Sequence, residues 1–285
     1  MPHRHVLIVV LVPVIMGFGF VISKPAMEFF PPILLNGLRW SLSGLIMFWF
    51  FPFPKKYFKQ IFFIALIGCT IQYSLTYSGL KIVDASSATL FVQAEVPFGL
   101  LVAFLILGEK PSIRNIIGVI IAFIGIYILT GDPKLEGKLI GVILLLSGAF
   151  TWAFAQVLAK PISQKMNALT LTAWIGVFAG PQSILASTLI EGNPIEFIMS
   201  ANLMAWIIML YLALIMNVLG YSLWYFVLGK YPVNFVMPGL LLLPVAGLLT
   251  AVLLLGETLT FYNLLGGSVV IVGVALILIN KRSTN

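Results

Sequence analysis

Glu95 is the residue whose position in this chain most directly suggests chemistry. Eight of the nine acidic residues lie at or near the ends of apolar segments, whereas Glu95 lies inside one, in the run 91–97. A carboxylate inside an apolar segment should face a wet cavity, pair with a cation or stay protonated, because its charge is costly there. Glu95 is therefore a candidate for proton coupling or for ammonium binding. The alternative is a structural carboxylate that pairs with Arg39 or Lys24.

A proline follows Glu95 closely. Pro97 lies two residues later and removes one backbone donor, so we expect the hydrogen bonding of this helix to be interrupted. Pro244 lies nearly opposite in the second half of the chain, one position out of register. Paired helices with interrupted hydrogen bonding are typical of a central site or hinge.

Three basic residues are candidate charge partners. Arg39 lies one to two turns into an apolar segment and could contact lipid headgroups, pair with an acidic residue such as Glu95 or Glu28, or bind a substrate carboxylate. Lys24 and Lys160 each end an apolar segment and are each followed by proline. They could hold a substrate carboxylate, or extend to the membrane interfaces and interact with a helix C-terminus.

Neutral polar and aromatic residues could complete a binding site. Phenols, amides and indoles supply hydrogen bonds in a buried cavity without the cost of a charge. Aromatic residues are also common at membrane interfaces, where they would have no substrate role. The residues that we predict to bind substrate are Gln72, Tyr77, Gln93, Glu95, Trp152, Gln156, Tyr221 and Trp224.

The sequence lacks the residues that catalysis or metal binding would need. Cys69 is the only cysteine, and the two histidines, His3 and His5, lie at the N-terminus. The sequence has no glycine-rich phosphate loop, no nucleophile elbow and no carboxylate pair with enzymatic spacing. We therefore expect no catalytic residues, no metal and no cofactor, and a protein that is not an enzyme.

The elements that position these residues are repeated along the chain. An offset of 148 relates the two halves, and an offset of 136 relates two shorter stretches near their starts. The repeats predict two related units, residues 1–131 and 132–285. In an apolar chain, such repeats indicate a transporter with its substrate site between the halves. The pairs are Tyr73 and Tyr221, Tyr77 and Tyr225, Leu107-Gly108-Glu109 and Leu255-Gly256-Glu257, Gly118 and Gly266, and Gly125 and Gly273, with Lys24-Pro25 and Lys160-Pro161 at the shorter offset.

The composition predicts a polytopic membrane protein made of helices. Hydrophobic residues make up 61% of the chain and charged residues only 9%, and the mean hydropathy is +1.11. A soluble domain carries about 25% charged residues. About 20 apolar residues span the hydrocarbon core, and we predict an all-α fold with ten such helices as two inverted five-helix repeats. The predicted spans are 6–23, 32–51, 61–80, 85–107, 113–130, 138–158, 168–189, 203–228, 233–255 and 261–279.

The distribution of basic residues predicts the orientation in the membrane. With the N-terminus in the cytoplasm, eleven of the sixteen Lys and Arg residues fall in cytoplasmic segments and four in external ones. This is the positive-inside bias, so both termini should be cytoplasmic and the net charge of +7 does not indicate nucleic-acid binding. Because each half has five spans, the second half must insert upside down relative to the first.

Taken together, these motifs resemble the EamA-type members of the drug/metabolite transporter superfamily. The stretches that carry the resemblance are 16–24, 31–40, 107–125 and 255–273. The resemblance implies ten helices in two inverted repeats that work by alternating access, commonly as exporters. Within this family the chain is similar to the bacterial O-acetylserine/cysteine exporter branch, but it departs from that branch at Met16, where tryptophan is usual, and at Glu95, where we expect glutamine.

The sequence thus predicts a multi-pass protein of the inner membrane that exports small amino-acid-like metabolites such as cysteine or O-acetylserine. Its expected partners are a small-molecule substrate and the lipid bilayer. A family member with another substrate class is the first alternative, because aromatic residues beside Glu95 also suit aromatic amino acids, drugs or a quaternary amine. A membrane-embedded scaffold or enzyme is the second.

Overall fold

The protein is a bundle of helices in this computed structural model, which describes residues 3–107, 112–231 and 242–278. These described residues form helices and no strand. Eight helical segments among them are long and apolar enough to cross a bilayer, in agreement with the first eight predicted spans. Two shorter apolar helices, α14 (Leu242–Leu255) and α15 (Phe261–Leu278), follow in the region of the predicted ninth and tenth spans.

The eight long segments follow one another with short connections. They are α1 (His3–Ala26), α2 (Pro32–Met47) with the 3₁₀ turn Phe48–Phe50, the combined segment α3 (Phe58–Ala65), η2 (Leu66–Ile71) and α4 (Gln72–Ile82), the pair α5 (Ala85–Val92) and α6 (Glu95–Leu107), α7 (Ile113–Thr130), α8 (Leu139–Ser163), α9 (Ala168–Ile190), and the combined segment α11 (Leu203–Tyr211), η4 (Leu212–Tyr221) and α12 (Ser222–Lys230). Short turns, η3 (Pro133–Leu135) and α10 (Pro194–Ser200), lie in the connections.

Some predicted features lie outside the described residues. Gly108 and Glu109 of the first repeated motif do so, as do Lys110, Lys281 and Arg282 of the charge pattern. Most of the stretch before Pro244, residues 232–241, is outside as well. The predicted ninth span is therefore described only over its second part.

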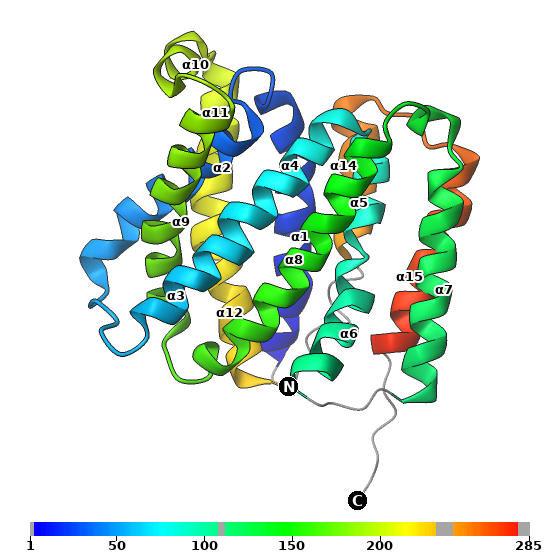
Figure 1. The fold of residues 1–285 in the computed structure, drawn as a ribbon, viewed down its shortest axis with the longest axis horizontal. Coiled ribbons are helices and arrows are strands. Elements are labelled where there is room, and N and C mark those ends of the chain that lie inside the picture. Colours follow the sequence, from blue (N-terminus) through cyan, green and yellow to red (C-terminus); the bar gives the residue numbers. More distant parts are fainter. Residues whose placement is uncertain (1–2, 108–111, 232–241, 279–285) are drawn as a thin grey trace, which may run out of the picture.

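Helices that are distant in sequence pack in pairs. The pairs in closest contact are α7 with α15, α2 with α9, α4 with α8, and α1 with α14. Figure 1 shows α7 and α15 at one end of the bundle and α2, α3 and α9 at the other, with α1, α4 and α8 between them. Each of these pairs joins an early helix to a later one, so the bundle is held together by contacts between the two halves of the chain.

Glycine permits the close contact between α7 and α15. A Cβ atom on Gly125 would lie 2.6 Å from the backbone nitrogen of Val270, and one on Gly273 would lie 2.4 Å from that of Ala122. These distances leave no room for a side chain, so the two backbones pack directly against each other. Repeated glycines of the two halves thus meet at this helix contact.

The fourth predicted span is broken at the position that Pro97 predicts. Helix α5 ends at Val92 and α6 begins at Glu95. The turn between them uses hydrogen bonds between residues three apart, from the amides of Gln93, Ala94 and Val96. Pro97 has no amide hydrogen to continue the α-helical pattern here. Glu95 therefore lies at the N-terminus of a helix and not in the middle of one.

Candidate functional site

A cavity lies in the interior of the bundle, and its walls come from both halves of the chain. The first half supplies residues of α1, α4, α5 and α6, and the second half supplies residues of α8, η4, α12 and α14. The lining residues are Met16, Phe20, Gln72, Tyr73, Thr76, Val92, Glu95, Trp152, Met216, Tyr221, Trp224 and Leu243. Five of the predicted substrate-binding residues are among them: Gln72, Glu95, Trp152, Tyr221 and Trp224.

Glu95 is the one charged residue among the described residues of this lining. Its exposed fraction is 5%, and among the described residues no basic side chain forms an ion pair with it. The carboxylate lies in the first turn of α6, where the free amides and the helix dipole favour a negative charge. It is thus available to a cation or a proton that enters the cavity.

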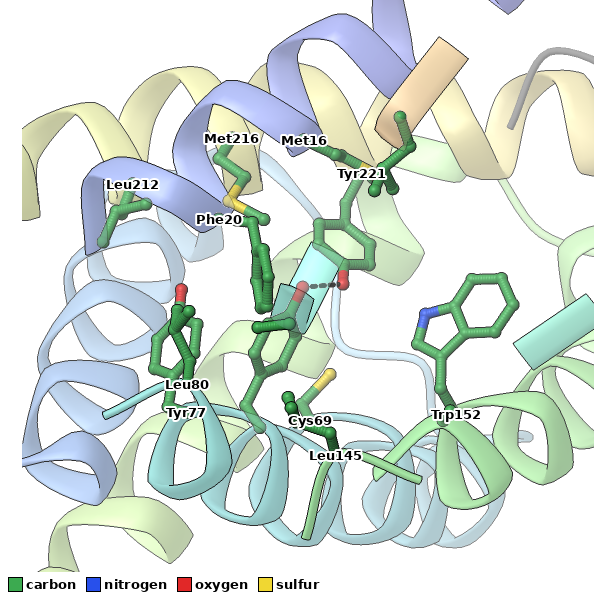
Figure 2. Packing of buried hydrophobic residues seen from close by; sticks show 14 of the residues in the cluster. Met16, Phe20, Cys69, Tyr77, Leu80, Leu145, Trp152, Leu212, Met216 and Tyr221 are labelled. Carbon is green, nitrogen blue, oxygen red and sulfur yellow. Dashed lines mark hydrogen bonds between the residues drawn. The ribbon is translucent and has the colours of Figure 1, made fainter. Parts of the chain in front are cut away.

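Two tyrosines from opposite halves meet in the cavity wall. The hydroxyl groups of Tyr73 and Tyr221 are 2.5 Å apart and form a hydrogen bond. Figure 2 shows this bond as a dashed line from Tyr221, with Trp152 to one side and Tyr77 to the other. Each tyrosine follows or ends a π-helical stretch, η2 in the first half and η4 in the second. Such stretches occur frequently at functional sites.

Trp224 is held in place by Gln156. The indole Nε1 of Trp224 donates to Oε1 of Gln156 at 3.1 Å, and the ring centroids of Trp152 and Trp224 are 6.1 Å apart. Trp152 and Trp224 line the cavity, whereas Gln156 does not. Gln156 therefore supports this wall through Trp224, and its direct contact with substrate stays a prediction.

Tyr77 and Gln93 also lie outside the lining. Tyr77 is fully buried and packs edge-to-face on Tyr73, with 5.2 Å between ring centroids. Gln93 is fully buried in the turn before Glu95, and neither polar atom of its side-chain amide has a hydrogen-bond partner among the residues that the structure describes. The structure thus brings these two predicted residues next to the cavity wall without opening them to the cavity.

Neither Lys24 nor Arg39 pairs with Glu95. The Nζ atom of Lys24 donates to the carbonyl oxygen of Val83 at 2.8 Å and lies 3.5 Å from Oε1 of Glu257. Lys24 therefore joins the end of α1 to the ends of two other helices, which is a structural role. Arg39 is fully buried behind the tyrosine wall.

Seven residues of the lining were not among the predicted substrate-binding residues. Tyr73 had a signal, because the repeat offset leads to it from Tyr221. The others are Met16, Phe20, Thr76, Val92, Met216 and Leu243. Most of these are apolar, and an apolar residue that faces a cavity has the same sequence signal as one that faces lipid or the core. The described residues contain no cluster of three or more His, Cys, Asp or Glu side chains that could hold a metal ion.

A bundle of membrane-length helices around a partly polar interior cavity defines a multi-pass membrane protein. Comparison with known proteins gives the family. The sequence model of the EamA-like transporter family matches residues 3–131 and 139–279. The chain therefore belongs to the EamA-like transporter family.

Relatives of known sequence span almost the whole chain. A probable amino-acid metabolite efflux pump of Salmonella typhimurium is 30% identical over 96% of this chain and 94% of its own length. A protein of Escherichia coli K12 with the same description is 28% identical over the same shares. One crystal structure, 16% identical in sequence, superimposes with a TM-score of 0.62 over 94% of this chain and 95% of its own, which supports the fold alone.

Proposed function

We propose that this chain is a secondary active transporter that exports small amino-acid-like metabolites across the cytoplasmic membrane, with cysteine and O-acetylserine as leading substrates. The observation that carries the proposal is the cavity: the carboxylate of Glu95, which pairs with no basic residue in the described part of the chain, faces neutral polar and aromatic groups contributed by both halves. The descriptions of the Salmonella and Escherichia relatives support the same substrate class.

In this proposal the architecture is ten transmembrane helices in two inverted five-helix repeats, residues 1–131 and 132–285, with both termini in the cytoplasm. The two separate ranges matched by the family model support the division. The meeting of Tyr73 and Tyr221, which the repeat offset relates, supports a site on the axis between the repeats. The basic residues of the sequence support the orientation.

The mechanism is alternating access around this cavity. Glu95 binds the substrate's ammonium group, or takes up a proton when substrate leaves, which couples export to the proton gradient. Gln72 and Tyr221 offer hydrogen bonds to the polar groups of the substrate, and Trp152 packs against its side chain. Opening toward either side requires the helices of the two halves to move relative to each other, which separates the hydrogen-bonded tyrosines.

A second substrate class is favoured by the aromatic rings around Glu95. Trp152, Tyr221 and Trp224 share the cavity with this carboxylate. Aromatic faces attract cations, and aromatic cages bind quaternary ammonium groups. A transporter of quaternary amines, drugs or aromatic amino acids is therefore the alternative.

Counterflow in proteoliposomes tests these proposals. Vesicles with purified protein are loaded with unlabelled cysteine, O-acetylserine, phenylalanine or choline, and uptake of the labelled compound is followed. Exchange of cysteine or O-acetylserine alone supports the leading proposal. Exchange of phenylalanine or choline instead overturns the substrate class and supports the alternative, and no exchange of any of the four contradicts both.

Two tryptophan variants provide a matched control. Trp152 lines the cavity, whereas Trp49 is 77% exposed on the surface of the bundle. Trp152→Phe should weaken exchange of the substrate, and Trp49→Phe should leave it unchanged. Equal effects of the two substitutions would contradict the placement of the site in this cavity.

A further inference from the structure

Arg39 is a fully buried cation for which the described part of the chain supplies no counter-ion. Its side chain has an exposed fraction of 0%. The ion pairs formed among the described residues join Lys24 to Glu257 and Lys138 to Asp84, and neither includes Arg39. The guanidinium group of arginine keeps its proton in proteins, so the charge remains inside the bundle.

Neutral groups stabilise this charge only in part. Nε of Arg39 donates to Oδ1 of Asn36 at 3.2 Å, and Nη1 lies 3.4 Å from the sulfur of Met216, a weak acceptor. The guanidinium carbon lies 3.8 Å from the ring centroid of Tyr73 and 5.1 Å from that of Tyr77, within the range of cation–π attraction. Nη2 finds no hydrogen-bond partner within residues 3–107, 112–231 and 242–278. A buried charge held this way is costly unless an anion approaches it during function.

The position of Arg39 relative to the cavity indicates what that anion is. Tyr73 and Met216 both line the cavity and both contact the guanidinium group. Arg39 is thus separated from the cavity by a single layer of side chains, to which Tyr73 and Met216 belong. Tyr73 is also the residue whose hydrogen bond to Tyr221 joins the two halves, so movement of the halves would displace part of this barrier.

We propose that Arg39 is the subsite for the carboxylate of the transported substrate, reached when Tyr73 and Met216 move aside. This inference rests on the proposed function, because it concerns how the same cavity binds its substrate. An amino acid would then be held at both ends, with its ammonium group at Glu95 and its carboxylate at Arg39. Arginine suits this role because its planar fork can form two parallel hydrogen bonds with a carboxylate.

The test compares ligands that differ only at the carboxylate. Cysteine has this group, cysteamine lacks it, and cysteine methyl ester has an uncharged ester in its place. Binding to the purified full-length protein is measured as the ligand concentration that gives half of the maximal thermal stabilisation, under reducing conditions. Because hydrogen bonds to charged groups are strong, cysteine should bind roughly tenfold or more tightly than either analogue.

Two variants assign this preference to Arg39. Arg39→Met removes the charge and keeps much of the side-chain volume, so the ratio of cysteine to cysteamine affinity should fall to about one. Asn36→Asp preserves shape and places a carboxylate where the Asn36 oxygen now accepts from Arg39. This internal carboxylate should pair with the guanidinium group and so also lower the ratio of cysteine to cysteamine affinity. Lys138→Gln, which removes a surface ion pair, is the control and should leave the ratio unchanged.

The outcomes separate this inference from the proposed function. Equal binding of cysteine and cysteamine by the wild type keeps an amino-acid-like substrate and overturns the role of Arg39. That role is also overturned if the variants that remain monodisperse keep the wild-type ratio, and Asn36→Asp decides where Arg39→Met does not fold. Absence of binding by all three compounds contradicts the substrate class itself, and the carboxylate subsite with it.

Discussion

The hydroxyl groups of Tyr73 and Tyr221 form a hydrogen bond 2.5 Å long, and the two residues lie 148 positions apart in the chain. The same offset relates the repeated residues of the two halves. The two π-helical stretches obey it as well, because residues 66–71 correspond to 214–219 within the second stretch. This contact between the halves is thus built from matching residues at matching helical irregularities.

The tyrosine pair should show strong coupling between its two members. Tyr73→Phe or Tyr221→Phe alone leaves the other buried hydroxyl without this partner, at a cost of about 1–3 kcal/mol, whereas replacing both removes the two polar groups together. We therefore expect the double variant to melt at a higher temperature than either single variant in detergent. Additive losses of melting temperature would show that the hydroxyl groups act independently.

Glu95 should be responsible for the dependence of transport on pH. Protons compete with the substrate's ammonium group for this carboxylate, so exchange by the wild type should weaken as the pH falls. Glu95→Gln keeps the shape but cannot titrate, and its exchange should be weaker and independent of pH. Proteoliposome exchange measured over a range from mildly acidic to mildly alkaline pH checks this.

The control for that series is Glu28→Gln. Glu28 is exposed and lies outside the cavity, so its variant should keep the pH profile of the wild type. A Glu95→Gln protein with an unchanged profile would remove Glu95 from the coupling role.

The helices of this fold could be predicted from hydropathy because the bilayer demands long apolar segments. The break before Glu95 could be predicted from Pro97, since its missing amide hydrogen removes a backbone hydrogen bond at this turn. Proline alone does not determine a break, because α9 continues through Pro181. The π-helical stretches Leu66–Ile71 and Leu212–Tyr221 could not. They contain no proline, and their geometry depends on packing between helices that are distant in sequence.

In the candidate site, the sequence could predict only residues that are polar or that carry a polar group on an aromatic ring. Glu95, Gln72 and Tyr221 could be predicted to line a cavity because polar groups inside a membrane segment are costly to bury and so indicate a functional role. Phe20 and Leu243 could not be predicted in this way, because their types are also used toward lipid. Gln156 lies four residues after Trp152 and so on the same helix face, but spacing alone does not reveal that its amide bonds to Trp224.

The ionised carboxylate of Glu257 should stabilise the folded protein, and this stabilisation should be lost at acidic pH. Its two carboxylate oxygens accept hydrogen bonds from the amides of Ala85 and Ser86 at 2.8 and 2.9 Å, at the start of α5. Burial by itself raises the pKa of Glu257, but these bonds and Lys24 outweigh it and lower the pKa below its ordinary value. Because the folded pKa is lowered, the stabilisation is present above the ordinary pKa and disappears as the pH falls through the folded value.

Glu257→Gln should therefore lower the free energy of unfolding by about 1–2 kcal/mol near neutral pH, the usual size of a helix-capping contribution. The difference from the wild type should shrink as the pH falls below about 4.5, the ordinary pKa of a glutamate side chain. Melting temperatures in detergent across this range measure it. A difference that stays constant down to the lowest pH would contradict the role of the ionised carboxylate.

The contact between α7 and α15 should be sensitive to a single methyl group. A Cβ on Gly125 would lie 2.6 Å from the nitrogen of Val270 and 2.8 Å from the oxygen of Gly266, both of which are backbone atoms that cannot rotate away. Gly125→Ala must therefore push the helices apart, and we expect a loss of about 1–3 kcal/mol, typical of overpacking.

Gly99 in α6 provides the matched control, since the only described atom that its added Cβ would meet is the Cβ of Ala153, at 4.0 Å. Gly99→Ala should be neutral or stabilising by up to about 1 kcal/mol, because alanine favours a helix over glycine. Melting temperatures of both variants in detergent distinguish these expectations. If Gly125→Ala proves as stable as Gly99→Ala, the two helices are not packed backbone to backbone.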